Sequence, residues 1–244
     1  MLTRSWTERP FAVLDTETTD VNPYTAHIVQ LALVLVAPDG GILEAHNAII
    51  NPGVPIPQTA SAVHGIDDAA VKEHGAHPLP VLKNLSMMLS GLAHMGWPLV
   101  IYTAVFDWPL ILSHFHRHGV AMPRRTPHII DPLVIDRKLN PFRPGLRRLS
   151  HVAAAFGYQL TNAHDALEDC LATAAVLRGL IRQHPRLGRY SLDQLDRLQA
   201  LWHRRWAEEL MEFRRKIGRP VSISPRWPYD PDKFEAHHGV RLEA

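Results

Sequence analysis

The sequence predicts a layered fold of the α/β or α+β kind. Three strand-like runs follow one another near the N-terminus, and two further short runs then alternate with helical segments. The chain has 244 residues, of which 46% are hydrophobic. This is enough apolar material for one large domain, or for a domain with an extension.

The first run ends on two carboxylates. Residues 11–14 (FAVL) are followed directly by Asp15 and Glu17, which is typical of a central strand that ends at the rim of a sheet. Alternate side chains of a strand share a face, so the two carboxylates point the same way and repel each other. A hard divalent cation such as Mg²⁺ or Mn²⁺ relieves such a repulsion. The alternative is a strand end with two solvated acids.

The next two runs form a hairpin. Residues 28–37 and 42–50 are rich in aliphatic residues, and the turn-forming residues 38–41 (PDGG) join them. The first three strands are therefore expected to pair as an antiparallel meander.

The rest of the chain alternates helices and strands. Leucine and methionine residues recur at helical spacing over 79–94, and this stripe is expected to be core. The elements expected in order are a short helix capped by Asp67 or Asp68, helix 79–94, strand 99–102, a helix from 103 to about 118, strand 129–130, a helix begun by Pro132, and helices 145–156 and 166–181.

Composition limits the function classes. The net charge is +2, and no apolar run approaches the roughly 18 residues that cross a membrane. The first residues include Arg4, Glu8 and Arg9 and no apolar core, so a signal peptide is not expected. Cys170 is the only cysteine, which excludes an internal disulfide framework and suits a reducing compartment. The expected location is the cytoplasm, with no membrane partner.

Three further polar residues are ordinary when taken singly. Asp107 follows a predicted strand at a helix start, where an acid often serves as a cap. His164 could be a surface imidazole and Asp169 part of a solvated helix face. The five-residue offset between these two is about 140° on a regular helix, so they can meet only if His164 belongs to the preceding loop or to the fraying first turn.

Together these residues form three motifs in a characteristic order: Asp15-x-Glu17, Phe106-Asp107 and residues 164–169 (HDALED). In this order they resemble the DEDDh family of 3′-5′ exonucleases, the group like the proofreading subunit of bacterial DNA polymerase III. The resemblance covers about residues 9–183. It implies an RNase H-like α/β fold with a five-stranded mixed sheet flanked by helices, which agrees with the meander. Further similar segments are residues 16–19 (TETT), residues 63–66 (VHGI), and Asp131 with Leu133 and Arg137.

The resemblance implies metal-dependent hydrolysis of phosphodiester bonds at a free 3′ end, releasing nucleoside 5′-monophosphates. The implied cofactors are two Mg²⁺ or Mn²⁺ ions per active site, which activate a water and stabilise both oxygens of an in-line displacement. The implied metal ligands are Asp15, Glu17, Asp107 and Asp169, and His164 is the implied general base. The expected substrate is single-stranded or frayed DNA.

Four residues match family positions around the terminal nucleotide, namely Thr16, Thr18, His64 and Phe106. For His64 the alternative is an imidazole satisfied within a turn. Seven basic residues could in addition track a phosphate backbone or form a solvated face: Arg124, Arg125, Arg137, Lys138, Arg143, Arg147 and Arg148.

The sequence departs from the family pattern at three positions. Asp20 replaces a glycine that commonly closes the first motif, Thr103 replaces a frequent Asn before Phe-Asp, and Thr59 replaces a frequent substrate-contacting Glu. Asp tolerates left-handed backbone better than most residues. None of these changes removes a metal ligand, so they affect nucleotide positioning and substrate preference rather than hydrolysis.

Beyond residue 183 the resemblance ends, and residues 184–244 form an extension. Residues 191–217 predict a helix opened by a capping box of Ser191 and Gln194. Residues 181–244 carry a net charge of +4, against −2 for the first 180. The extension could bind nucleic acid, dock a replication or repair protein, or pack on the catalytic domain, which its leucines at helical spacing favour. Residues 218–244 are expected to be an extended wrap or a disordered end.

Two function classes remain open. The first is an active exonuclease that serves proofreading, repair or nucleotide salvage, and the second is a non-catalytic nucleic-acid-binding accessory protein. The set of four acids and one histidine favours the enzyme, because a binding module has no need for mutually repelling carboxylates. Within the enzyme class an exoribonuclease is the near rival, because the sequence contains no reliable reader of the 2′-hydroxyl.

Overall fold

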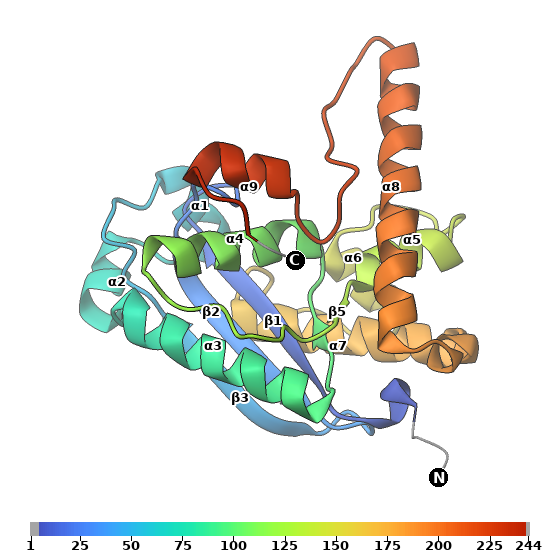
Figure 1. Ribbon diagram of the computed structural model, residues 1–244, viewed down its shortest axis with the longest axis horizontal. Coiled ribbons are helices and arrows are strands. Elements are labelled where there is room, and N and C mark those ends of the chain that lie inside the picture. Colours follow the sequence, from blue (N-terminus) through green and yellow to red (C-terminus); the bar gives the residue numbers. More distant parts are fainter. Residues whose placement is uncertain (1–4, 243–244) are drawn as a thin grey trace.

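The computed structural model describes residues 5–242, and its five strands form one sheet with the order β3-β2-β1-β4-β5 (Figure 1). The strands are β1 (Phe11–Thr18), β2 (Ile28–Val36), β3 (Ile42–Ile49), β4 (Leu99–Val100) and β5 (Ile129–Ile130). The α-helices are α1 (Gln58–His64), α2 (Asp68–His74), α3 (Pro78–Met95), α4 (Ala104–Arg117), α5 (Pro132–Leu139), α6 (Leu149–Ala155), α7 (Ala166–Gln183), α8 (Leu192–Lys216) and α9 (Pro231–His238). Two 3-10 turns are η1 (Trp6–Glu8) and η2 (Pro185–Arg189).

The sheet is mixed, and β1 lies at its centre. β1 pairs antiparallel with β2, and β2 pairs antiparallel with β3, so the predicted meander is confirmed. On the other side, β4 lies parallel to β1, and β5 lies parallel to β4. β4 is shorter than the predicted strand 99–102, because the chain turns at Thr103, which has left-handed backbone with φ 72°.

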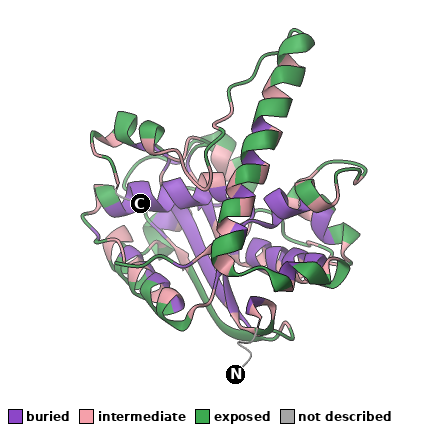
Figure 2. Ribbon diagram, turned by 45° about the vertical axis from the view of Figure 1, so that its right-hand side comes forward, coloured by how far each residue is buried: buried purple, intermediate pink, exposed green. Residues whose placement is uncertain are grey.

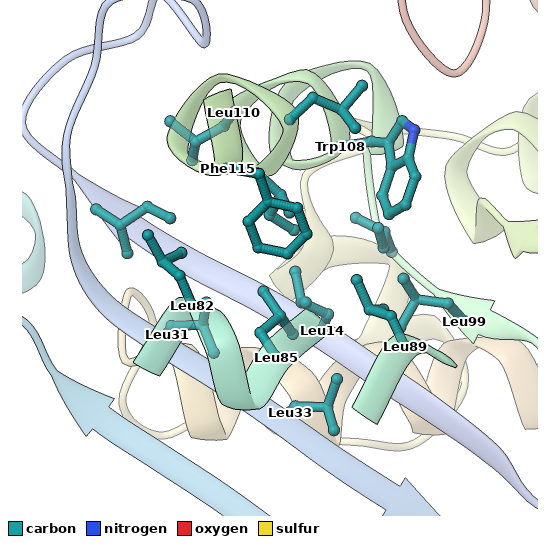
Figure 3. Packing of buried hydrophobic residues seen from close by; sticks show 14 of the residues in the cluster. Leu14, Leu31, Leu33, Leu82, Leu85, Leu89, Leu99, Trp108, Leu110 and Phe115 are labelled. Atoms are coloured by element: carbon teal, nitrogen blue, oxygen red, sulfur yellow. The ribbon is translucent and has the colours of Figure 1, made fainter. Parts of the chain in front are cut away.

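One face of the sheet packs against α3 and α4 (Figure 3). The leucine stripe predicted over 79–94 is core: Leu82, Leu85 and Leu89 are fully buried against Leu14 of β1. The helix is begun by the side chain of His77, which accepts a hydrogen bond from the backbone of α3, and by a proline in the first turn. This packing sets the distance between α4 and the sheet. Helix α4 carries part of the site.

The opposite face packs against α6 and α7. Val13 of β1, Val152 of α6, and Cys170 and Val176 of α7 are completely buried there. Strand β1 is therefore covered on both faces, as its unbroken apolar run predicted. The two layers place α4 and α7 on opposite sides of the end of β1.

Helix α6 is shorter than predicted. The sequence favoured 145–156, but the helix covers Leu149–Ala155. The loop before it is held by Arg143 and Arg147, which both bind the buried carboxylate of Asp136. These two arginines are thereby committed to a structural ion pair and are not free to track a phosphate backbone.

Helix α8 packs on the body of the protein as far as Ala207, its last buried residue, and not over its last turns. The capping box of Ser191 and Gln194 is present, and the helix contacts α5 and β5. The last turns project from the body of the protein (Figures 1 and 2), and Phe213 is 56% exposed. The expected burial of the whole apolar stripe is therefore wrong for the distal turns.

The chain after α8 does not remain extended. Residues 218–230 are non-helical, and the chain then forms α9, which the sequence analysis missed. Phe234 of α9 is completely buried against α4, and His238 lies 3.0 Å from the hydroxyl of Ser113. Pro231 at the first helical position and the capping carboxylate of Asp230 were the available signals. Within residues 5–242, no helix is both long and apolar enough to cross a membrane.

Candidate active site

The carboxylates of the first motif lie at the end of β1. Asp15 and Glu17 alternate with Thr16, so the acids point to the α7 face of the sheet. Thr16 points the other way, and its hydroxyl donates a 2.6 Å hydrogen bond to Asp107 of α4. The end of β1 therefore lies next to Asp107 on one face of the sheet, and its own two acids point to the α7 layer on the other face.

Asp107 lies in the first turn of α4 and is only 5% exposed. Burial raises its pKa to about 7, and the hydrogen bond from Thr16 partly opposes this rise. The start of α4 is fixed by Asp131, whose carboxylate accepts from the backbone N–H of Thr103 at 3.2 Å and of Ala104 at 2.9 Å. Asp131 therefore holds the turn that places Asp107 beside β1.

His164 belongs to the loop before α7, as its convergence with Asp169 required. Its backbone is left-handed, with φ 69°, and its N–H donates to Asp169 at 3.3 Å. The side chain of Asp165 caps α7 at its first turn. Ring or carboxylate atoms of Glu17, His164 and Asp169 all lie within 4.8 Å of one another. The imidazole is exposed, whereas both carboxylates are buried.

The four carboxylates are electrostatically unfavourable together. Burial, followed by the charges of Asp107, Asp169 and Glu17, raises the pKa of Asp15 well above its usual range. Burial and the neighbouring Asp169 raise the pKa of Glu17 to about 8, and burial raises that of Asp169 to about 6. One buried oxygen of Asp169 has no hydrogen-bond partner within residues 5–242. This set of hard oxygen donors fits a divalent metal ion.

A cavity of about 700 Å³ opens beside Glu17. All four predicted substrate residues line it, namely Thr16, Thr18, His64 and Phe106. In His64, Nδ1 accepts from the backbone of Ile66 at 3.1 Å, while the buried Nε2 has no protein partner in the described chain. The turn explanation of His64 therefore accounts for one nitrogen only.

Residues of the C-terminal extension form hydrogen bonds with Asp131, which holds the start of α4. The buried amide of Gln199 in α8 accepts from the N–H of Asp131 at 2.7 Å and donates to the carbonyl of Ile129 at 2.9 Å. In this way it continues the hydrogen bonding of the edge strand β5. The indole of Trp227 donates to the same Asp131 at 3.4 Å. Sequence reasoning did not find this link, because it joins residues far apart in the chain.

Gln30 is a second supporting residue that the sequence analysis missed. It is buried in β2, its carbonyl accepts from Ala166 at 3.1 Å, and its amide donates to Asp165 at 3.4 Å. These bonds fix the start of α7, and hence Asp169, over the sheet. A lone glutamine in an otherwise apolar strand was the available signal.

The three departures from the family pattern have different structural contexts. Among the described non-glycine residues, positive φ occurs at Thr103 and His164, so Asp20 does not need the left-handed backbone that was allowed for it. Its carboxylate accepts from the N–H of Val21 at 2.6 Å instead. Thr59 and Asp20 both line the cavity beside Glu17. These positions therefore bear on the ligand and not on the carboxylate cluster.

Comparisons with known proteins agree with this geometry. A family model described as Exonuclease matches residues 12–177. The DNA polymerase III PolC-type protein of Streptococcus thermophilus is 31% identical over 193 residues, which are 78% of this chain and 12% of that protein. The corresponding protein of Caldanaerobacter subterraneus is 25% identical over 189 residues. This chain thus spans only a small part of the length of these relatives.

Solved structures share the fold. Exonuclease I of E. coli in complex with a dT13 oligonucleotide has a TM-score of 0.65 at 21% identity, covering 75% of this chain and 43% of that chain. Exonuclease X in complex with 5′ overhanging duplex DNA has a TM-score of 0.57 at 21% identity, covering 78% and 99%. With the match over residues 12–177, the chain belongs to the exonuclease family, within the DEDDh-type 3′-5′ exonucleases of the RNase H-like superfamily.

Proposed function

We propose that this protein is a metal-dependent 3′-5′ exonuclease that hydrolyses the terminal phosphodiester bond of single-stranded or frayed DNA. The observation that carries the proposal is the cluster of Asp15 with the buried Glu17, Asp107 and Asp169, beside a cavity that His64 also lines. Folding brings four mutually repelling carboxylates together at a cost, and a catalytic metal site is the chemistry that needs them there.

The proposed metal ligands are these four carboxylates, and the proposed ions are two Mg²⁺ or Mn²⁺. When bound, the ions supply activation of the attacking water and stabilisation of charge on the attacking and leaving oxygens. The hydroxyl of Thr16 has a separate role, because its 2.6 Å hydrogen bond keeps the carboxylate of Asp107 in one orientation. Nothing in this role requires contact with the nucleotide.

His164 is the proposed general base. Its imidazole is exposed beside Glu17 and Asp169, and imidazole is the side chain that most readily exchanges a proton near neutral pH. It takes one proton of the attacking water as the water oxygen forms a bond to phosphorus. The bond from phosphorus to the 3′-oxygen of the preceding nucleotide breaks, that oxygen is protonated from solvent, and a nucleoside 5′-monophosphate is released.

The terminal nucleotide is proposed to occupy the cavity of about 700 Å³. His64 is proposed to contact the nucleotide, and burial lowers the pKa of this imidazole, which favours the neutral form. The exposed side chains of Val21 and Val63, at 86% and 53%, form an apolar rim suited to a base. The likeness to Exonuclease I bound to a dT13 oligonucleotide supports single-stranded DNA as the substrate class.

We further propose that residues 9–183 form the catalytic unit and that 184–244 complete it. The bonds from Gln199 and Trp227 to Asp131 support this assignment, because they link the extension to the start of α4. A replication or repair protein that binds the projecting turns of α8 would add to this role. A non-catalytic accessory protein is the alternative function.

The test uses 5′-labelled single-stranded DNA and RNA of the same sequence. Each is incubated with Mg²⁺, Mn²⁺ or EDTA, beside the Asp15→Asn variant. The expected result is a ladder that shortens from the 3′ end of DNA, needs the cation and is absent in the variant. Faster shortening of RNA would make the protein an exoribonuclease. Binding without shortening of either strand would support the accessory function.

A further inference from the structure

A second polar cavity, of about 280 Å³, lies between α5 and α8. It is separate from the carboxylate cluster, and none of the acids at the end of β1 lines it. Its lining is basic and aromatic. The residues that matter here are Arg137, Lys138, Arg205, Trp206 and His203.

Arg137 is the unusual group in this cavity. Its guanidinium stacks over the ring of Trp206 at 3.6 Å from the centroid. Within residues 5–242 it forms no hydrogen bond and no ion pair, whereas Arg143 and Arg147 of the same basic segment share Asp136. Partial burial lowers the pKa of Arg137, and the charges of Asp131 and Asp136 only partly oppose this fall.

A guanidinium whose orientation is fixed in this way can bind an anion without further ordering. Its planar donors match the two oxygens of a phosphate, and the stacked indole fixes the orientation of the fork. Lys138 and Arg205 add positive charge around the same space, against the single carboxylate of Glu209. The cavity therefore selects an anionic group of about the size of phosphate.

Two shared lining residues connect this cavity to the active site. Val21 lines both the active-site cavity and a third cavity, of about 470 Å³, between the loop after β1 and the C-terminal strap of residues 223–237. His203 lines both this third cavity and the one that holds Arg137. The third cavity contributes Lys233, whereas its Arg226 is paired with Asp230 and Asp232. The three cavities therefore neighbour one another in sequence, through Val21 and His203, from the nucleotide site to α8.

We propose that the cavity between α5 and α8 binds a backbone phosphate of the nucleic-acid strand whose 3′ end lies in the active site. The proposal rests on the proposed function and assigns the substrate-holding role to Arg137, with Trp206 as its support. It makes the C-terminal extension part of the substrate path. A strand must be longer than a dinucleotide to reach Arg137, because the third cavity lies between the two sites.

The experiment measures binding of single-stranded DNA from two to about twenty nucleotides long, in the Asp15→Asn background to prevent degradation. It compares Arg137→Gln with Arg186→Gln, a matched loss of one charge on the exposed turn η2. Arg137→Gln should weaken binding of the long strand about tenfold. It should also reduce the slope of log affinity against log salt by about 0.7, the value for one phosphate of a single strand. Arg186→Gln should change neither quantity.

The length dependence separates the possible outcomes. Binding and, in the otherwise wild-type protein, hydrolysis of the dinucleotide should be unaffected by Arg137→Gln. Equal weakening for short and long strands, or no difference from Arg186→Gln, would overturn the proposal while leaving the exonuclease function intact. If the wild-type protein neither binds nor shortens any strand, the proposed function fails, and the phosphate site fails with it.

If Arg137→Gln does not fold, two other variants still test the proposal. Arg205→Gln removes a second charge from the same cavity, and Arg205 is exposed on α8, so the fold should tolerate it. A smaller but length-dependent loss of affinity is expected there. Arg137→Lys keeps the charge and loses the fork, and it should retain the salt slope while binding the long strand more weakly.

Discussion

Replacing Glu17 with Gln should stabilise the metal-free protein at pH 8 and have little effect at pH 5. Glu17 is 8% exposed, and burial together with the neighbouring carboxylates raises its pKa from 4.5 to about 8. A carboxyl whose pKa is higher when folded binds its proton more tightly in the native state. The corresponding stability is present below about pH 4.5 and is lost as pH rises towards 8. Glutamine keeps the neutral form at every pH.

The size of the effect follows from the same values. A rise in pKa from 4.5 to about 8 corresponds to about 5 kcal/mol, at about 1.4 kcal/mol for each pH unit. Asp15, Asp107 and Asp169 share the repulsion and also take up protons. One substitution therefore recovers only part of this free energy. We expect a gain of about 2 kcal/mol at pH 8 and of less than about 1 kcal/mol at pH 5. For a chain of this length, 2 kcal/mol raises Tm by about 4 to 8 °C.

Thermal denaturation in EDTA, followed by circular dichroism at the two pH values, measures this gain. Glu208→Gln, on the exposed side of α8, is the matched control and should leave Tm unchanged at both. Adding Mg²⁺ or Mn²⁺ should stabilise the wild-type protein more than Glu17→Gln, because the cation replaces the missing countercharge. A lower Tm for Glu17→Gln at pH 8, or a gain independent of pH, would refute the electrostatic account of the cluster.

Three further predictions concern single residues. His164→Ala should reduce the rate of hydrolysis by about 10² to 10⁴ without changing Tm, and an unchanged rate in a nuclease assay would remove it from the mechanism. Thr103→Asn should raise stability by about 1 kcal/mol, because a β-branched residue occupies left-handed backbone at φ 72°; urea denaturation would detect the gain or its absence. Gln199→Ala leaves two buried backbone groups of β5 and Asp131 unpaired and should cost about 2 to 4 kcal/mol, with a lower kcat as α4 loosens; a fully stable and active variant would make the extension a separate module.

The sequence by itself determined the elements whose signals are local. Apolar runs with turn residues between them gave the meander, the leucine spacing gave α3, and the capping box gave the start of α8. It also pointed to the carboxylate cluster, because three motifs in the same order resemble those of the DEDDh exonucleases. Helix geometry also indicated that His164 can meet Asp169 only from outside the regular helix, whereas its left-handed backbone came from the structure.

Only the tertiary structure decided how these parts are supported. Three sets of hydrogen bonds provide this support: Gln199 to β5, Asp131 to the start of α4, and Gln30 to the start of α7. Each joins residues distant in sequence, so no periodic pattern in the sequence predicts it. In the sequence Arg137 looked the same as Arg143, and folding alone gave Arg143 a carboxylate and placed Arg137 in the lining of a cavity. Local spacing fixes which side chains share a face of one element. Which of them remain unpartnered depends on the packing of elements from opposite ends of the chain.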